Sequence, residues 1–259
     1  MVKAIVGANW GDEGKGKITD LLAEASDVVI RFQGGANAGH TIICDYGKFA
    51  LHQLPSGVFY PHTTNIIGNG VALDVKKFLA ELKHLADGGV PAPHIIVDQR
   101  TQLLMSYHVL LDSYEEERLA GAAFGSTKSG IAPFYSDKYQ KKTVMAGELL
   151  HPQHLKEHLA DLLEWKNLTL QKVYGAKGWT MDELMNWVDT YCEAVKPYIT
   201  NTTAFLRDAQ KAGKSILFEA QLGALRDLDY GIYPYTTSSN SVAAYAPVGS
   251  GLPTAKLDE

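Results

Sequence analysis

The sequence predicts an α/β fold, in which a mostly parallel central sheet carries helices on both faces, as in P-loop nucleotide-binding domains, beside a helical subregion. A short apolar run leads into a glycine-rich turn, Gly7 to Lys17, and an amphipathic stretch, Ile18 to Glu24, follows it. A second β-rich run, Asp27 to Phe32, ends in another glycine-rich segment, Gln33 to Thr41. From about residue 151 to 213 the periodicity is mainly helical.

Length and composition fit a single globular domain spanning residues 1–259. Apolar residues make up 46% of the chain and charged residues 20%, which are ordinary values for a folded domain. The net charge of −5 argues against nucleic acid as a partner. The two cysteines, Cys44 and Cys192, form no disulfide framework. Met1 to Lys3 enter a strand without a signal peptide. No apolar run approaches the roughly 20 residues that span a bilayer. We therefore expect a cytoplasmic protein with no membrane segment.

The first glycine-rich turn predicts a phosphate-binding loop, and hence an α/β nucleotide-binding domain. Glycines between a strand and a helix start let backbone N–H groups converge, and the helix N-terminus adds partial positive charge. Residues Gly11 to Lys17 fit the G-x-x-x-x-G-K half of a P-loop pattern, but Ile18 stands where that pattern has the Ser or Thr that holds magnesium. Asp12 is the nearest hard oxygen ligand for such an ion. The alternative is a glycine turn with solvated charges.

The second glycine-rich segment again follows a strand, at the edge of an open α/β sheet where ligands bind. The spacing of the two strands fits a βαβ unit with parallel strands. We expect the two loops to lie on adjacent strands and to face one crevice.

Turn signals and periodicity predict the elements up to residue 150. They are a hairpin around Asp45 to Gly47, a strand from Asn65 that turns at Gly68 to Gly70, a helix capped by Asp74 that runs to about His84, a strand from His94 to Val97, a helix from Met105 to about Arg118, and a loop from Gly121 to Pro133. Within that loop, Gly125 to Gly130 suits either anion binding or a plain flexible loop.

The same signals predict the later elements. They are a helix with a leucine stripe from Leu155, a helix opened by a capping box at Thr180, an end or kink at Pro197, a helix from Thr202 closed by Gly213, a strand from Ser215 to Glu219, a loop from Gln221 to Asp227, and a run of hydroxyls, Tyr233 to Asn240, at another strand end. We expect these helices to serve packing and a dimer surface rather than chemistry.

Five segments, in one order along the chain, resemble adenylosuccinate synthetase, the GTP-dependent enzyme family of AMP synthesis. They are the first loop with Trp-Gly-Asp-Glu-Gly-Lys-Gly-Lys, the second loop with Asn-Ala-Gly-His-Thr, Gly130 to Pro133, Asp137-Lys138, and Tyr233 to Asn240. The resemblance runs over all 259 residues. It implies a homodimeric ligase that uses magnesium (Mg2+) and joins IMP to L-aspartate while GTP becomes GDP and phosphate.

The resemblance implies two catalytic residues, Asp12 and His40. Asp12 would take the N1 proton of IMP, so that O6 attacks the γ-phosphate of GTP, and the aspartate amine would then displace phosphate from the 6-phosphoryl intermediate. His40 would donate a hydrogen bond or a proton to the phosphoryl groups, although a histidine in such a loop could instead be a helix cap. Asp12 and the carbonyl of Gly39 would bind magnesium.

The resemblance also implies two overlapping nucleotide sites. The GTP site would comprise Gly11, Asp12, Glu13, Gly14, Lys15, Gly16, Lys17, Gly39, His40 and Thr41. The IMP site would comprise Asp12, Glu13, Gly14, Lys15, Asn37, Ala38, Gly39, His40, Thr127, Lys141, Gln221 and Thr237.

The chain departs from the family pattern at two of these positions. Lys141 stands where the family has an arginine that reaches into the partner subunit, and lysine keeps the charge but loses the bidentate fork. The place of a family glutamine falls on Leu222, one residue after Gln221. Either the loop rearranges so that Gln221 serves, or this contact to IMP is lost.

Family members are considerably longer, and their later part carries a Thr- and Arg-rich loop that binds aspartate and a Lys-x-Asp motif that reads guanine. Lys256-Leu257-Asp258 resembles that motif only superficially. We therefore expect an N-terminal portion that is incomplete relative to the family. Two other functions stay open, a related synthetase for a modified purine nucleotide and a non-catalytic nucleotide-binding module.

Overall fold

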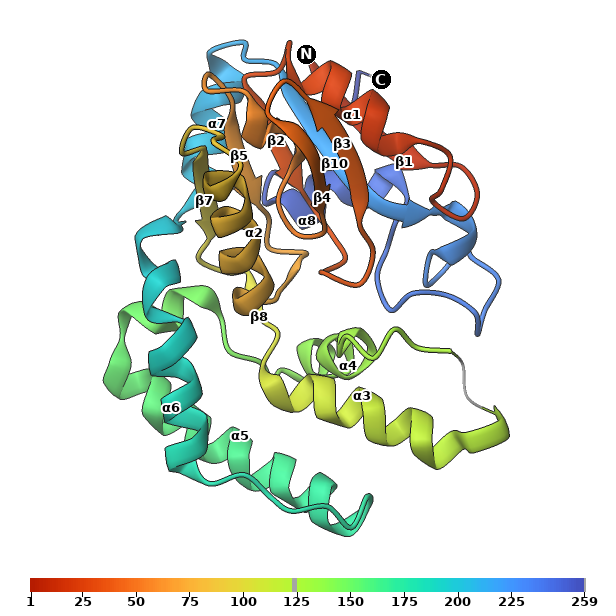
Figure 1. Cartoon of the computed structure of the whole chain (residues 1–259), viewed down its shortest axis with the longest axis vertical. Helices are drawn as coiled ribbons and strands as arrows, with labels where there is room; N and C mark the ends of the chain where they lie inside the picture. The colour runs from red at the N-terminus through yellow and green to blue at the C-terminus, as the bar shows by residue number, and fades with distance from the viewer. Residues whose placement is uncertain (123–124, 259) are drawn as a thin grey trace.

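The computed structural model describes residues 1–122 and 125–258, and within these ranges the central sheet has six strands, all parallel (Figure 1). In spatial order the strands are β1 (Val2–Gly7), β10 (Ile216–Gly223), β2 (Val28–Arg31), β5 (Thr64–Ile67), β7 (His94–Asp98) and β9 (Ile199–Thr200). The predicted mostly parallel sheet is confirmed.

The strands that lead into the two glycine-rich loops are not adjacent, and that prediction is wrong. The late strand β10 inserts between β1 and β2 and pairs with both, so that Glu219 lies level with Ile5 on one side and Arg31 on the other. No local pattern encodes which strands pair, because that choice depends on contacts between segments far apart in the sequence, such as Val2 with Ile216 and Val28 with Ile216. The two loops therefore meet across the end of β10.

Side chains alternate between the two faces of the sheet, and helices cover both faces as predicted. On one face Val29 and Leu217 pack against α1 (Lys15–Ala23), and α2 (Val75–Asp87) packs beside Ile67. On the other face Ile30 and Phe218 pack with α7 (Thr202–Lys211) and the short helix α8 (Ala246–Ser250). The N- and C-terminal ends lie close together (Figure 1), where Asp258 exchanges hydrogen bonds with Val2.

Several locally encoded elements are confirmed. The hairpin consists of β3 (His40–Cys44) and β4 (Gly47–Leu51), and the carboxylate of Asp74 caps α2 by accepting hydrogen bonds from the backbone N–H groups of Lys76 and Lys77. A small parallel pair, β6 (Ala72–Leu73) with β8 (Gln102–Leu103), lies beside the main sheet. The 3-10 turns are η1 (Ser56–Phe59), η2 (Ala120–Ala122), η3 (Ala146–Leu150), η4 (Glu193–Tyr198), η5 (Ala224–Arg226) and η6 (Ala243–Tyr245).

The helical subregion lies below the sheet in Figure 1. It is built from α3 (Ser106–Leu119), α4 (Ile131–Gln140), α5 (Pro152–Lys172) and α6 (Met181–Tyr191). Thr180 forms the predicted capping box with Glu183. The predicted effect of Pro197 is wrong in position, because α6 already ends at Tyr191 and Pro197 lies in η4. The edge strand β9 follows immediately and was not predicted.

Two loop predictions need correction. Helix α4 begins inside the predicted loop Gly121 to Pro133, of which Ala123 and Phe124 lie outside the described residues, and Pro133 fits the first helical turn because no backbone donor is needed there. Gln221 to Gly223 belong to β10 and not to a loop. The hydroxyl run from Tyr233 does not follow a strand end directly, because η5 and turns separate it from β10.

A buried charge cluster joins α3, α4 and α5. Asp137 accepts a hydrogen bond from Nε2 of His108 at 2.8 Å and forms an ion pair with Lys166. All three residues are at least 96% buried. Burial by itself raises the pKa of Asp137, but the His108 hydrogen bond and the Lys166 charge outweigh it, and the pKa is lowered.

The burial of the neutral His108 makes the stability of the protein sensitive to acid. Nδ1 accepts the backbone N–H of Met105, so Nε2 carries the hydrogen donated to Asp137. Burial lowers the pKa of the His108 imidazole below 6.5. As the pH falls, the unfolded chain therefore binds a proton at His108 before the folded chain does. We expect the free energy of unfolding to fall as pH drops through about 6.5, with a shallower dependence in His108→Gln, measured by urea titration at several pH values. An equal slope in both proteins would contradict this.

The two cysteines should differ in reactivity. Cys192 is fully buried, and burial raises the pKa of its thiol to about 12, whereas Cys44 is partly exposed. Because the thiolate is the reactive form, iodoacetamide should label Cys44 in the native protein and reach Cys192 only after denaturation. Mass spectrometry of the alkylated peptides measures this, and native labelling of Cys192 would contradict the packing described.

Among the described residues, no helix is both long enough and apolar enough to cross a membrane.

Candidate functional site

Residues at and just after the end of β10 contact the first glycine-rich loop. Leu225 donates its backbone N–H to the carbonyl of Asn9 at 3.0 Å, and a Cβ on Gly11 would lie 2.4 Å from the Cα of Leu222. Gly11 has φ +106°, so this position requires glycine for both space and conformation. Gly14 is the N-cap, also with positive φ, and α1 begins at Lys15. The loop therefore delivers its backbone into the first turn of a helix, as predicted for a phosphate cradle.

The backbone donors of this loop already hold an anion, the carboxylate of Glu13. Its oxygens accept hydrogen bonds from the N–H of Asn9 at 3.1 Å and from the N–H of Gly11 at 3.0 and 3.1 Å. The bond from Gly11 is the main reason why the pKa of Glu13 is lowered. A phosphate that used the same N–H groups would have to replace this carboxylate.

We expect Glu13→Ala to bind inorganic phosphate more tightly than the parent protein does. A phosphate that uses the N–H groups of Asn9 and Gly11 must first displace the side chain of Glu13, and the variant removes that competitor. Titration followed by ³¹P NMR measures the affinity. Glu24→Ala, at an exposed position just after α1, is the control. Unchanged or weaker binding in Glu13→Ala would contradict the competition.

The charged side chains of the loop differ in placement. Lys15 folds back so that Nζ donates to the carbonyl of Gly11 at 2.7 Å, and burial lowers its pKa. Asp12 and Lys17 are exposed. Among the described residues, the carboxylate of Asp12 has no hydrogen-bonded or ion-paired partner, which leaves its oxygens available to a ligand or a cation.

His40, at the start of β3, lies directly against this helix start. A Cβ on Gly16 would lie 2.9 Å from Cδ2 of His40, so glycine at position 16 makes room for the ring. Nε2 of His40 lies 2.9 Å from Oγ of Ser56 and 3.5 Å from Oε1 of Glu219. Burial lowers the pKa of His40, Arg31 and Lys15 lower it further, and Glu219 opposes them. The histidine and the phosphate loop therefore meet, although their strands are not neighbours.

The side-chain amide of Gln221 is hydrogen-bonded to the backbone of the second loop. Its Nε2 donates to the carbonyls of Gly35 and Ala38, both at 2.6 Å, and its Oε1 accepts the N–H of Gly35 at 3.1 Å. The residue is 5% exposed. Leu222 follows with φ +62°. The amide of Gln221 is thus committed to the backbone of the loop in this structure.

Two further segments converge on the same loop. The hydroxyl of Tyr135 in α4 accepts the N–H of Gly34 at 3.0 Å, and Oγ of Ser239 donates to Oε1 of Gln33 at 3.2 Å. These contacts bring α4 and the segment that contains Thr237 to the end of β2. Thr41 and Thr127 are exposed, and Thr237 is partly exposed. Lys141 is the C-cap of α4, at the opposite end of this helix from Gly130. Its side chain is exposed, and its φ is +62°.

Two asparagines near these loops have buried oxygens without a partner. Among the described residues, Oδ1 of Asn37 and Oδ1 of Asn69 accept no hydrogen bond, and such groups are costly unless a ligand or water satisfies them. Lys138 donates to the backbone carbonyl of Asn69 at 2.9 Å, and burial lowers its pKa to about 8. Asn37 was predicted as a binding residue, whereas Asn69 was not.

The described residues contain no cluster of three or more His, Cys, Asp or Glu side chains that could hold a metal by themselves. The donors that the resemblance suggested are the carboxylate of Asp12, which has no partner among the described residues, and the backbone carbonyl of Gly39. Magnesium commonly takes one or two carboxylates and completes its shell with phosphate oxygens and water, so this donor set fits magnesium bound together with a nucleotide.

Sequence reasoning missed three residues of the site, Arg31, Ser56 and Glu219. Arg31 and Glu219 lie side by side on β2 and β10, both 3% exposed or less, with Nη1 and Oε1 3.0 Å apart. A signal was available, because a charged residue inside an otherwise apolar strand is almost never buried without a partner. Ser56 carries no comparable signal.

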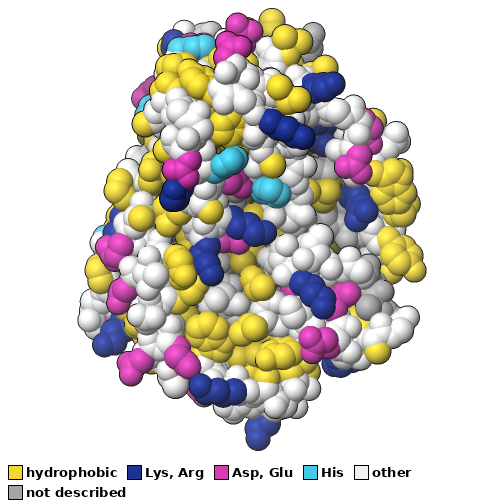
Figure 2. Space-filling model, viewed as in Figure 1, with side chains coloured by type: hydrophobic (Ala, Val, Ile, Leu, Met, Phe, Trp, Pro, Cys, Tyr) yellow, Lys and Arg dark blue, Asp and Glu magenta, His cyan; other side chains and the backbone are white. Residues whose placement is uncertain are grey.

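Figure 2 shows lysine and histidine side chains gathered across the middle of the face, between the sheet and the helices α3 and α4 below. A cavity of about 290 Å³ on the second loop's flank is lined by His52, Lys77, Ala80, Glu81 and His84. Lys77 reaches from it to the carbonyl of Ala36 at 3.1 Å. Basic groups therefore surround the converging loops.

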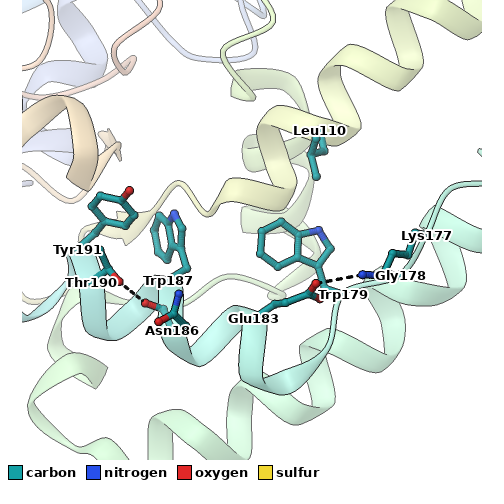
Figure 3. A pocket seen from close by; sticks show the side chains of 9 residues that line it. All are labelled: Leu110, Lys177, Gly178, Trp179, Glu183, Asn186, Trp187, Thr190 and Tyr191. Carbon is teal, nitrogen blue, oxygen red and sulfur yellow. Dashed lines mark hydrogen bonds and ion pairs between the residues drawn. The ribbon is translucent and has the colours of Figure 1, made fainter.

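A second cavity, of about 480 Å³, lies in the helical subregion and not at the loops. Figure 3 shows Trp179 and Trp187 on its wall, with Lys177 and Glu183 paired with each other at one end. None of the predicted site residues lines it. We place the functional site at the loops, because the unpaired polar groups and the anion-holding backbone are there.

Comparison with known proteins gives one consistent result. The sequence model of the family described as "Adenylosuccinate synthetase" matches residues 4–259. The adenylosuccinate synthetase of Carboxydothermus hydrogenoformans is 44% identical over 255 residues, which are 98% of this chain and 60% of that protein. Adenylosuccinate synthetase 2 of Pseudoalteromonas translucida is 46% identical over 251 residues, again 60% of that protein. The chain thus spans about 60% of the length of these curated relatives.

Solved structures agree. A fully ligated adenylosuccinate synthetase from Plasmodium falciparum superimposes with a TM-score of 0.87 at 33% identity, over 99% of this chain and 59% of that one. A succinoaminodeoxyadenylate synthetase of cyanophage S-2L superimposes with a TM-score of 0.66 at 21% identity, which shows a shared fold alone.

Proposed function

The chain belongs to the adenylosuccinate synthetase family, and on that premise we propose that it carries the phosphate-binding and IMP-binding part of a ligase. The proposed reaction joins IMP to L-aspartate and converts GTP to GDP and phosphate. The product, adenylosuccinate, belongs to AMP synthesis. The observation that carries the proposal is the loop whose N–H groups hold the Glu13 carboxylate, with His40 packed against the helix that this loop begins.

In the first proposed step, Asp12 removes the proton from N1 of IMP. The electrons released toward O6 make that oxygen the nucleophile, which attacks the γ-phosphorus of GTP while the bond to the GDP oxygen breaks. In the second step the amine of aspartate attacks C6 and phosphate leaves. The exposed carboxylate of Asp12, which has no hydrogen-bonded or ion-paired partner among the described residues, suits a base of this kind.

The remaining residues of the two loops would bind and stabilise the phosphoryl group. Lys15, Lys17 and the N–H groups of Gly14 and Gly16 would stabilise negative charge, and His40 would donate to a phosphoryl oxygen. Gly11 and Thr41 would complete the GTP site, together with Glu13 once its carboxylate has left the N–H groups of Asn9 and Gly11. Magnesium would be held by Asp12 and the carbonyl of Gly39, and would neutralise charge on the phosphates.

We propose Asn37, Ala38, Thr127 and Thr237 as direct IMP contacts. The unsatisfied Oδ1 of Asn37 supports its assignment. Since the amide of Gln221 is committed to Gly35 and Ala38, we propose that Gln221 contributes to the IMP site by shaping this loop. Lys141, exposed at the end of α4, is available to reach a partner subunit in a cytoplasmic homodimer.

A single assay tests the function. The protein is incubated with GTP, magnesium, IMP and aspartate, and the absorbance of adenylosuccinate is followed. Product formation supports the ligase. Nucleotide binding that depends on IMP but yields no product supports the non-catalytic module. Turnover with a different purine monophosphate alone would support a related synthetase.

A further inference from the structure

We propose that Ser56 and Glu219 are positioning residues for His40, and that together they fix its neutral imidazole as the tautomer with hydrogen on Nε2. Nδ1 is then the ring nitrogen left for a substrate atom. The functional meaning rests on the proposed function, in which His40 faces the phosphoryl groups. The hydrogen-bond chain itself is independent of that function.

The direction of each hydrogen bond follows from the donors available. The carboxylate of Glu219 only accepts, and it takes the hydroxyl of Ser56 on Oε1 at 3.1 Å and the backbone N–H of Ser56 on Oε2 at 2.8 Å. A serine hydroxyl has one hydrogen, so Oγ of Ser56 must accept at its other contact. That contact is Nε2 of His40 at 2.9 Å, which therefore carries the hydrogen. Oε1 of Glu219, 3.5 Å from Nε2, favours the same tautomer.

The acceptor end of this chain is fixed in place. Glu219 is 2% exposed and lies in an ion pair with Arg31, whose Nη1 is 3.0 Å from Oε1. Arg31 is itself 3% exposed and donates through Nη2 to the carbonyl of His52 at 3.2 Å. Because β2 and β10 pair directly at these two residues, the sheet holds Glu219 in register beneath the loop.

The ring of His40 is confined on its other side as well. Gly16, in the first turn of α1, leaves room for the ring and no more, since a Cβ there would lie 2.9 Å from Cδ2 and 3.0 Å from Cβ of His40. The charged and titratable groups that act on His40 are Glu219, Arg31, Lys15 and His52. Among the described residues, Nδ1 of His40 has no hydrogen-bonded partner. The packing thus leaves one nitrogen engaged and one free.

The test is a spectroscopic measurement of the tautomer. The full chain is labelled with ¹⁵N-histidine, and long-range ¹H–¹⁵N correlation spectra are recorded at a pH where His40 is neutral. The His40 signals are identified by their loss in His40→Gln. We expect a pattern in which Nε2 carries the hydrogen. A dominant form with hydrogen on Nδ1 would overturn the proposal without any further variant.

Ser56→Ala tests the relay, because it removes the acceptor for Nε2 and leaves the ion pair of Glu219 in place. We expect a mixture of tautomers in this variant. Ser26→Ala is the matched control, since Ser26 is also buried but bonds to the carbonyl of Leu22, away from His40. An unchanged tautomer in Ser56→Ala, or an equal change in Ser26→Ala, would overturn the relay.

A kinetic arm separates this inference from the proposed function. If the protein transfers phosphoryl groups, Ser56→Ala should slow the transfer by about 10- to 100-fold, the range typical for hydrogen-bond partners of metal-binding histidines. The affinity for IMP should stay unchanged. Failure of all transfer in the parent protein would contradict the proposed function and leave the tautomer result standing. Normal transfer in Ser56→Ala would overturn the positioning role alone.

Discussion

Asp12→Asn should abolish phosphoryl transfer to IMP while leaving both nucleotides able to bind. Asparagine has nearly the shape of aspartate but cannot accept the N1 proton, so the loss should match the contribution of a general base, about 10²–10⁴-fold. The exposed, unpaired position of Asp12 means that the change disturbs no hydrogen bond among the described residues. We therefore expect an effect on the rate and not on folding.

Positional isotope exchange measures this step without requiring aspartate. GTP labelled with ¹⁸O in the β,γ-bridge scrambles its label only if the bond to the γ-phosphate breaks and re-forms. Scrambling should depend on IMP and should be lost in Asp12→Asn. Asp182→Asn, in the exposed first turn of α6, is the control and should exchange normally. Normal exchange in Asp12→Asn would show that another group is the base.

Asp137→Asn should destabilise the fold by about 3–5 kcal/mol, the usual result of removing one partner from a buried ion pair. The substitution leaves the ammonium of Lys166, 3% exposed, without a charge partner, and weakens the acceptor for His108. Because the cluster joins three helices, its loss should loosen the whole helical subregion. Urea denaturation should show a lower midpoint.

The control for this prediction is Asp87→Asn, which breaks the ion pair of Lys83 with Asp87 on the surface of α2. Those side chains are 74% and 60% exposed, so the expected cost is at most about 1 kcal/mol. Similar losses for the buried and the exposed pair would contradict the account of the cluster. So would a stable Asp137→Asn variant with normal helix content.

Local chemistry explains which parts of the fold were predictable. Asp74 and Thr180 are caps whose carboxylate or hydroxyl acts within three residues, and the hairpin turn at Asp45 to Gly47 is equally short in range. Such signals lie in consecutive residues and can be read directly. The strand, the glycine-rich turn and the helix start of the first loop were predictable for the same reason, since they are contiguous.

Long-range pairing explains what was missed. The insertion of β10 between β1 and β2 is decided by packing across the whole sheet, and β9 is only two residues long, too short for any periodicity. Ser56 acquires its role only because β10 brings Glu219 beneath it. Gln221 likewise braces the second loop through contacts more than 180 residues distant. Residues that position others are therefore harder to find in a sequence than residues that touch a ligand.

The central claim is that Asp12 and His40 serve one site that holds IMP and the γ-phosphate of GTP together. The most direct test is a crystal structure of this chain with IMP, magnesium and a non-hydrolysable GTP analogue. We predict that the Asp12 carboxylate lies within hydrogen-bond distance of N1 of IMP, that His40 lies beside the phosphoryl oxygens, and that Glu13 has left the N–H groups of Asn9 and Gly11. A structure in which the carboxylate and the imidazole face separate cavities, too far apart to share one nucleotide pair, would contradict the account.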